Sequence, residues 1–122
     1  MLKKVAFTMY PVKDVARARD FYENKLGLKV GMNGNFGDKW WIEYDLPGGG
    51  CFALENFGEA EPSANAGGTI AFEVEDLDRL VAELKAQNVV FKGDLVCGPN
   101  CRMQVCLDTE GNAVLLHQLN KK

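Results

Sequence analysis

The chain has 122 residues, of which 47% are hydrophobic and 25% are charged, and its formal net charge is −3 at pH 7. This length suits one domain with its own core, and the composition is that of a folded globular protein rather than a disordered one. The acidic balance, without a cluster of Lys or Arg, argues against a nucleic-acid partner.

The beginning of the chain predicts a strand followed by a helix. Residues 5–10 are rich in apolar and β-favouring side chains, and Asp14 stands where a helix N-cap is expected. Gly27 is placed to end the helix, whose apolar face consists of Val15, Ala18, Tyr22 and Leu26. Three shorter strands are predicted next, at about residues 28–32, 40–45 and 51–57.

The second half predicts the same order of elements. A strand at residues 69–74 leads to Asp76 as an N-cap, and the helix after it has an apolar face formed by Leu77, Leu80, Val81 and Leu84. Three more strands are predicted at about residues 90–96, 102–107 and 113–119. Between the halves, residues 58–67 have the composition of a linker. The sequence therefore predicts an α+β protein of two tandem βαβββ modules, at about residues 1–57 and 68–122.

An internal repeat supports this organisation. Residues 12–17 (VKDVAR) recur as residues 74–79 (VEDLDR), 62 positions later. Residues 42–48 (IEYDLPG) match residues 105–111 (VCLDTEG), 63 positions later. A match sustained over so much of each half indicates a duplication.

Three motifs form a pattern that extends over most of the chain: residues 12–22 (VKDVARARDFY), 25–28 (KLGL) and 108–112 (DTEGN). In this order they resemble the vicinal-oxygen-chelate superfamily, which includes glyoxalase I, bleomycin-resistance proteins, fosfomycin-resistance enzymes and extradiol dioxygenases. Thr109 departs from the proline that the family has in its last turn. The resemblance implies a single domain over residues 1–122, with a cupped mixed and antiparallel sheet and helices on its outer face. It also implies a homodimer.

Metal-dependent members of this superfamily place ligands on the first and last strands of each module. Carried over residue by residue, these positions are Phe7, Phe52, Thr69 and Leu115. None of these side chains offers the imidazole, carboxylate or thiolate that divalent metals usually need. We therefore expect neither a bound metal nor another cofactor.

The resemblance also implies that the cup holds a small molecule. Trp40 and Trp41 must point to opposite faces of their strand, and the sequence leaves open which of them faces the cup. Glu55, three positions after Phe52, is expected on the face opposite that residue. The predicted pocket residues are Phe7, Met9, Trp40, Trp41, Phe52, Leu54, Thr69, Glu73, Leu115 and His117. The alternative is that these side chains fill a collapsed core.

Three residues are candidates for catalysis: His117, Cys101 and Glu73. An imidazole can act as a general base near neutral pH, but the only histidine of the chain can also be a structural residue on a half-buried strand. A metal site built from His117, Glu73 and a thiol is a further alternative. Arg102 beside Cys101 would favour a reactive thiolate only if the two side chains met, and neighbours on a strand usually point apart.

Two functions follow from these observations. The first is a small-molecule-binding protein of the bleomycin-resistance type, with an apolar, aromatic-lined cup and no metal. The second is a lyase, isomerase or transferase of the glyoxalase type that uses a metal-free or rearranged acid–base site. The four unsuitable metal positions favour the first. Because no stretch approaches the roughly 20 apolar residues needed to cross a bilayer, and the start of the chain lacks a signal peptide's apolar run, we expect a cytoplasmic protein with no membrane partner.

Overall fold

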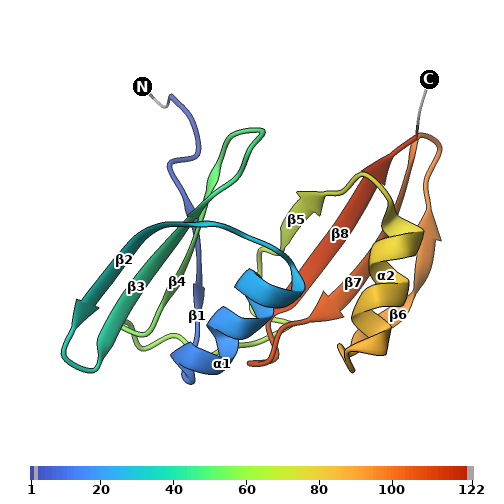
Figure 1. The fold of residues 1–122 in the computed structure, drawn as a ribbon. Helices are drawn as coiled ribbons and strands as arrows, with labels where there is room; N and C mark the ends of the chain where they lie inside the picture. Colours follow the sequence, from blue (N-terminus) through green and yellow to red (C-terminus); the bar gives the residue numbers. More distant parts are fainter. Residues whose placement is uncertain (2, 121–122) are drawn as a thin grey trace. The chain divides into compact units, whose positions relative to one another are not determined.

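The computed structural model describes residues 1 and 3–120. It consists of two compact units, Met1–Pro62 and Ser63–Lys122, each with one four-stranded sheet and one helical segment (Figure 1). The predicted α+β fold of two tandem βαβββ modules is confirmed. Within the described residues, no helix is both long and apolar enough to span a membrane.

Each unit has the same strand order. The elements of the first unit are β1 (Thr8–Pro11), α1 (Val15–Arg19), the π-helix η1 (Asp20–Lys25), β2 (Val30–Phe36), β3 (Lys39–Asp45) and β4 (Cys51–Glu55). Those of the second are β5 (Ile70–Glu73), α2 (Leu77–Ala86), β6 (Phe91–Cys97), β7 (Cys101–Leu107) and β8 (Ala113–Leu119). The sheets have the orders β1-β4-β3-β2 and β5-β8-β7-β6. The first strand of each unit runs parallel to the last, and the other neighbours are antiparallel.

Both helices begin at the aspartates that the sequence indicated. The Asp14 carboxylate accepts a hydrogen bond from the Arg17 backbone N–H at 3.0 Å, and the Asp76 carboxylate accepts one from Arg79 at 3.1 Å. These bonds satisfy backbone donors that a helix leaves unpaired in its first turn. Gly27 follows the first helix with a φ of 76°, a conformation that glycine adopts without steric cost.

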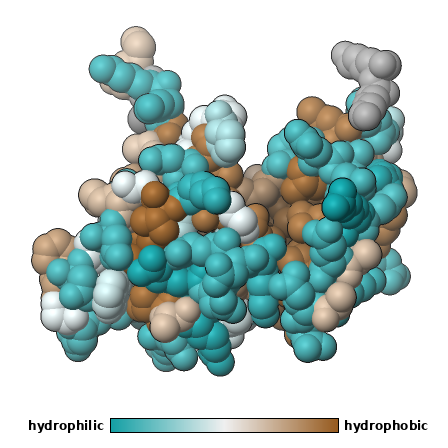
Figure 2. Space-filling model, viewed as in Figure 1, coloured by the Kyte–Doolittle hydropathy of each residue, from teal (hydrophilic) through white to brown (hydrophobic). Residues whose placement is uncertain are grey.

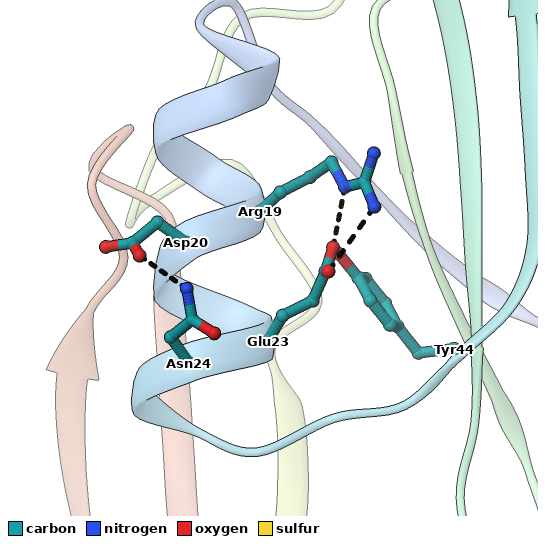
Figure 3. Close-up of polar contacts among 5 residues, drawn as sticks. All are labelled: Arg19, Asp20, Glu23, Asn24 and Tyr44. Atoms are coloured by element: carbon teal, nitrogen blue, oxygen red, sulfur yellow. Dashed lines mark hydrogen bonds and ion pairs between the residues drawn. The ribbon is translucent and has the colours of Figure 1, made fainter.

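The second half of the first helix is wider than the α-helix expected from its apolar spacing. The Leu26 backbone N–H donates to the Phe21 carbonyl, five residues earlier, at 3.0 Å. On this turn Glu23 accepts hydrogen bonds from Arg19 at 2.6 Å and from the Tyr44 hydroxyl at 2.8 Å (Figure 3). Burial raises the pKa of Glu23, but the bonds from Arg19 and Tyr44 outweigh it and lower the pKa overall. The hydrogen bonds of Glu23 with Arg19 and Tyr44 link the helix to β3.

The core of the first unit lies between this helix and the sheet. The Phe52 ring on β4 is fully buried and packs against Tyr10, Tyr22 and Tyr44, with ring centroids 5.2, 5.0 and 6.4 Å away. Leu54, on the same face of β4, is fully buried as well. Burial of side chains this large makes the helix-facing side of the sheet the main source of stability of this unit.

The second unit repeats the arrangement with fewer aromatic rings. Leu77 and Leu84 of α2 are fully buried, and so is Val114 on β8. The Leu77 backbone N–H donates to the side-chain oxygen of Gln118 at 2.7 Å, which links the start of α2 to β8. The face of this sheet that carries Val114 is therefore the core face.

The strand register shows that the internal repeat has a constant offset. Thr8 pairs with Phe52 in the first sheet, and Ile70 pairs with Val114 in the second, so each partner recurs 62 positions later. The sequence match at 63 positions was therefore misplaced by one residue. Ala53, and not Phe52, corresponds to Leu115. A shift of one residue turns every side chain of a strand to the opposite face.

This register corrects two predicted pocket residues. Phe52 and Leu54 were expected in the cup, but both point towards the helix and belong to the core. The structure therefore contradicts their assignment as ligand-contacting residues. The side chains on the opposite face of β4 are those of Cys51, Ala53 and Glu55, because successive residues of a strand alternate between faces.

Candidate functional site

The first sheet has a groove on the face opposite its helix. The groove has a volume of about 740 Å³. Its lining comes from β1 to β4 and the segment after β4, and consists of Met9, Met32, Asn33, Gly34, Phe36, Trp41, Glu55, Phe57, Gly58, Glu59 and Ala60. Several apolar members are well exposed, among them Phe36 at 67% and Met9 at 53%. Figure 2 shows hydrophobic side chains at the surface of both units, among mostly hydrophilic neighbours.

Trp41, rather than Trp40, faces this groove. Its indole meets the Phe7 ring edge-on, with centroids 5.2 Å apart, and its Nε1 donates to the Glu43 carboxylate at 2.6 Å. These two contacts hold the indole in one orientation. Trp40 lies on the other face of β3, where it borders a separate recess beside the start of α1 together with Asp14 and Asn56. The structure thus answers a question that the sequence left open.

The predicted pocket included only Met9 and Trp41 of this lining, and Glu55 is the most buried charged residue that it missed. It lies directly opposite Trp41 on the neighbouring strand, and only 5% of it is exposed. Its Oε1 accepts hydrogen bonds from the backbone N–H groups of Phe57 and Gly58, both at 2.9 Å. The prediction that Glu55 and Phe52 face opposite ways is correct, but Phe52 faces the helix, so Glu55 faces the groove. The constant 62-residue offset is the signal that would have placed it there.

The second sheet brings together two of the three catalytic candidates. His117 Nδ1 lies 2.6 Å from Glu73 Oε1, and the other oxygen of Glu73 accepts a hydrogen bond from the Leu119 backbone N–H at 2.7 Å. The bond with His117, assisted by the one from Leu119, lowers the pKa of Glu73. The sequence grouped His117 with Glu73 only as part of an alternative metal site, and the structure pairs the two side chains directly. A carboxylate on Nδ1 leaves Nε2 as the nitrogen that can take up a proton.

The third candidate, Cys101, lies on β7 and, among the described residues, forms no hydrogen bond with Glu73 or His117. It lies opposite Leu119 on the face of β7 that carries Met103, whereas the guanidinium of Arg102 bonds to Asp78 at 2.9 Å. The two neighbouring side chains therefore point apart, as expected of a strand. The sulfur of Cys101 lies next to Gly98, where an added Cβ would come within 3.1 Å of it. Cys101 thus leans towards the turn between β6 and β7 rather than towards β8.

Cys51 and Cys106 both have a raised pKa, each because of its own surroundings. Burial, and then the Glu43 and Asp45 charges, raise the pKa of Cys51, whose thiol lies 3.7 Å from the Glu43 carboxylate. Burial raises the pKa of Cys106 to about 12. Both effects keep these thiols protonated and unreactive at neutral pH.

The residues at the positions implied for metal ligands do not suit a metal. With the register corrected, these positions hold Phe7 and Ala53 in the first unit, and Thr69 and Leu115 in the second. Over residues 1 and 3–120, no three His, Cys, Asp or Glu side chains gather in a way that could hold a metal ion. These four side chains therefore do not form a divalent-metal site.

Several solved structures resemble the chain over nearly its whole length. TnmS3, an antibiotic-binding protein from Streptomyces sp. CB03234, is 22% identical, with a TM-score of 0.81 and coverage of 98% of each chain. The trypanothione-dependent glyoxalase I of Leishmania major is 26% identical, with a TM-score of 0.77 and coverage of 98% of this chain and 87% of that one. A superfamily member from Sphaerobacter thermophilus DSM 20745 is 24% identical, with a TM-score of 0.79 and coverage of 96% and 98%.

Sequence comparison gives the family more directly. No curated protein matches the chain. A family model matches residues 4–116, which cover most of both βαβββ modules. The resemblance inferred from the motifs is confirmed, and the chain belongs to the Glyoxalase/Bleomycin resistance protein/Dioxygenase superfamily.

Proposed function

We propose that this protein binds a small, flat and largely apolar molecule in the groove of its first unit, without a resident metal. The observation that carries the proposal is the gathering of exposed Met and Phe side chains around the half-buried Trp41 indole in one concave site. Its volume falls within the range of about 300–1,000 Å³ that is common for small-molecule sites. Exposed apolar side chains that share one concavity mark binding sites more often than scattered ones do.

The chemistry of the groove favours binding over turnover. Trp41, Phe36 and Phe57 offer aromatic rings, and Met9 and Met32 offer flexible, polarisable thioethers that adapt to a ligand's shape. The lining has two titratable groups, Glu55 and Glu59, and Glu55 already accepts two backbone hydrogen bonds. The description of TnmS3 as an antibiotic-binding protein agrees with a binding role on this fold.

The proposal can be tested by binding measurements with a matched pair of variants. A library of planar aromatic molecules, screened by thermal shift, should give hits that raise the melting temperature, because a ligand of the native state stabilises it. Phe36→Ala removes an exposed ring of the groove, and Val30→Ala removes an exposed side chain of the same strand outside it. Affinity should fall in the first variant only. Equal affinity in both variants would contradict the groove as the site.

The pairing of His117 with Glu73 supports a second candidate function, a metal-free lyase or isomerase of the glyoxalase type. A carboxylate that orients an imidazole is a common arrangement for a general base. If this function is correct, the protein converts a small molecule to product, and His117→Gln abolishes the conversion. Unchanged turnover in that variant would exclude His117 from the mechanism.

A further inference from the structure

We infer that Glu55 selects ligands with a hydrogen-bond donor, an amine or a hydroxyl, at the end of an apolar aromatic body. This inference rests on the proposed function, because it concerns the same groove. It adds the polar contact that would orient a ligand there.

The two oxygens of Glu55 have different surroundings. Oε1 accepts both backbone hydrogen bonds, from Phe57 and Gly58, whereas Oε2 has no partner among the described residues. Among the described residues, every fully enclosed side-chain nitrogen or oxygen has a partner, so the unpartnered Oε2 is not fully enclosed. A carboxylate on a residue that is only 5% exposed is held in place by its surroundings and loses little entropy when a ligand binds.

The surroundings of Glu55 also define where the donor would lie. Glu55 borders the apolar groove and a smaller adjoining recess of about 290 Å³. Glu59 also borders both, and the salt bridge between Lys13 and Glu61 lies at the recess. An apolar groove that continues into a polar recess suits a ligand with an aromatic body and one polar end. Since a carboxylate oxygen only accepts hydrogen bonds, that end must donate.

Three probes that share a naphthalene body test this inference by titration calorimetry. 2-Naphthylmethylamine and 2-naphthol carry donors, and 2-methoxynaphthalene carries none. We expect the intact protein to bind both donor probes roughly tenfold more tightly than the ether, the size expected of one hydrogen bond to a charged acceptor. The amine and the hydroxyl together show whether the preference follows donor capacity or only positive charge.

The matched variants are Glu55→Gln and Glu75→Gln, because Glu75 is an exposed carboxylate of the second unit that borders neither the groove nor the recess. Glutamine keeps an oxygen for the Phe57 and Gly58 N–H groups and places an NH₂ group where Oε2 was, so the fold is retained while the acceptor becomes a donor. The donor preference should disappear in Glu55→Gln and persist in Glu75→Gln. Equal binding of all three probes by the intact protein, a preference for the amine alone, or an equal loss in both variants would overturn the role of Glu55. If none of the probes bound at all, the proposed function itself would be contradicted.

Discussion

Trp41 and Glu55 lie directly opposite each other on β3 and β4, so an indole and a buried carboxylate border the same groove. Directly opposed residues have Cβ atoms about 4.5–5.5 Å apart, so one small ligand can touch both. The indole offers an apolar surface and the carboxylate offers an acceptor. The position of this pair makes the groove, rather than the core face of the same sheet, the place to look for a ligand.

The two tryptophans provide an internal comparison, because they are the only ones in the chain and lie on opposite faces of β3. In a Trp40→Phe variant, an aromatic ligand should still quench the remaining indole fluorescence. In a Trp41→Phe variant, quenching should be nearly lost, because the remaining indole faces away from the groove. Titration of both variants with one groove ligand gives the answer. Stronger quenching in Trp41→Phe than in Trp40→Phe would contradict the assigned faces.

The corrected register predicts the stability of two phenylalanine variants. Phe52→Ala should lower the free energy of unfolding by about 3–5 kcal/mol, because it opens a cavity among three tyrosine rings. Phe36→Ala should lower it by less than about 1 kcal/mol, because that ring is largely exposed. Urea unfolding of both variants measures the difference. Similar losses in the two variants would mean that Phe52 does not face the helix.

The hydrogen bonds of Glu23 predict a pH dependence. Since its pKa is lowered in the folded protein, it contributes stability above its ordinary pKa of 4.5, and the contribution is lost as pH falls through the folded value. Glu23→Gln should therefore lower the free energy of unfolding by about 1 kcal/mol at neutral pH, and the difference from the intact protein should shrink below pH 4.5. Denaturant unfolding at several pH values tests this. A difference that grew on acidification would contradict the sign of the shift.

The hydrogen bond between His117 and Glu73 in the second unit predicts a change in the pKa of Glu73 that can be measured directly. Replacing His117 with alanine should raise the pKa of Glu73 towards its ordinary value, because the imidazole bond is the largest cause of the lowering. Leu119 still donates to the carboxylate, so the return should be incomplete. Carbon-13 NMR of the Glu73 carboxyl group follows this change. An unaltered titration would mean that the two side chains do not interact in solution.

Metal analysis of the purified protein should find no stoichiometric Zn, Ni, Mn or Fe. The expectation follows from the side chains at the four family positions, which are two apolar residues, one aromatic ring and one threonine. Elemental analysis by mass spectrometry after extensive dialysis is the appropriate measurement. One firmly held ion per chain would contradict the metal-free binding site.

The order of elements could be predicted because it depends on local signals. Asp14 and Asp76 mark the helix starts, and the motif repeat marks the duplication. The strand faces depended on alignment of the turns, where the Asp and Gly shared by DLPG at 45–48 and DTEG at 108–111 favoured an offset of 63, and this slip of one residue exchanged Phe52 for Ala53. β4 also ends two residues before its predicted end, where the Glu55 carboxylate binds the backbone of the following turn. The homodimer, the single domain and the cytoplasmic location stay predictions.

Part of the site depends on strand pairing and turn geometry rather than on local sequence signals. Glu73 and His117 are 44 residues apart, and only the parallel pairing of β5 with β8 makes them neighbours. The widened turn of η1 has no local sequence signal that we can name. Phe57 lines the groove although it follows β4, because the turn anchored by Glu55 places it beside Phe36.

The central claim is that a small aromatic molecule occupies the groove of the first unit, and methionine methyl NMR tests it most directly. Met9 and Met32 line the groove, whereas Met103 lies on β7 of the second unit. With methyl-labelled protein and a naphthalene probe, we predict saturable shifts of the Met9 and Met32 signals and at most small changes at Met103. Signals of Met9 and Met32 that stay fixed while the probe binds would contradict the account.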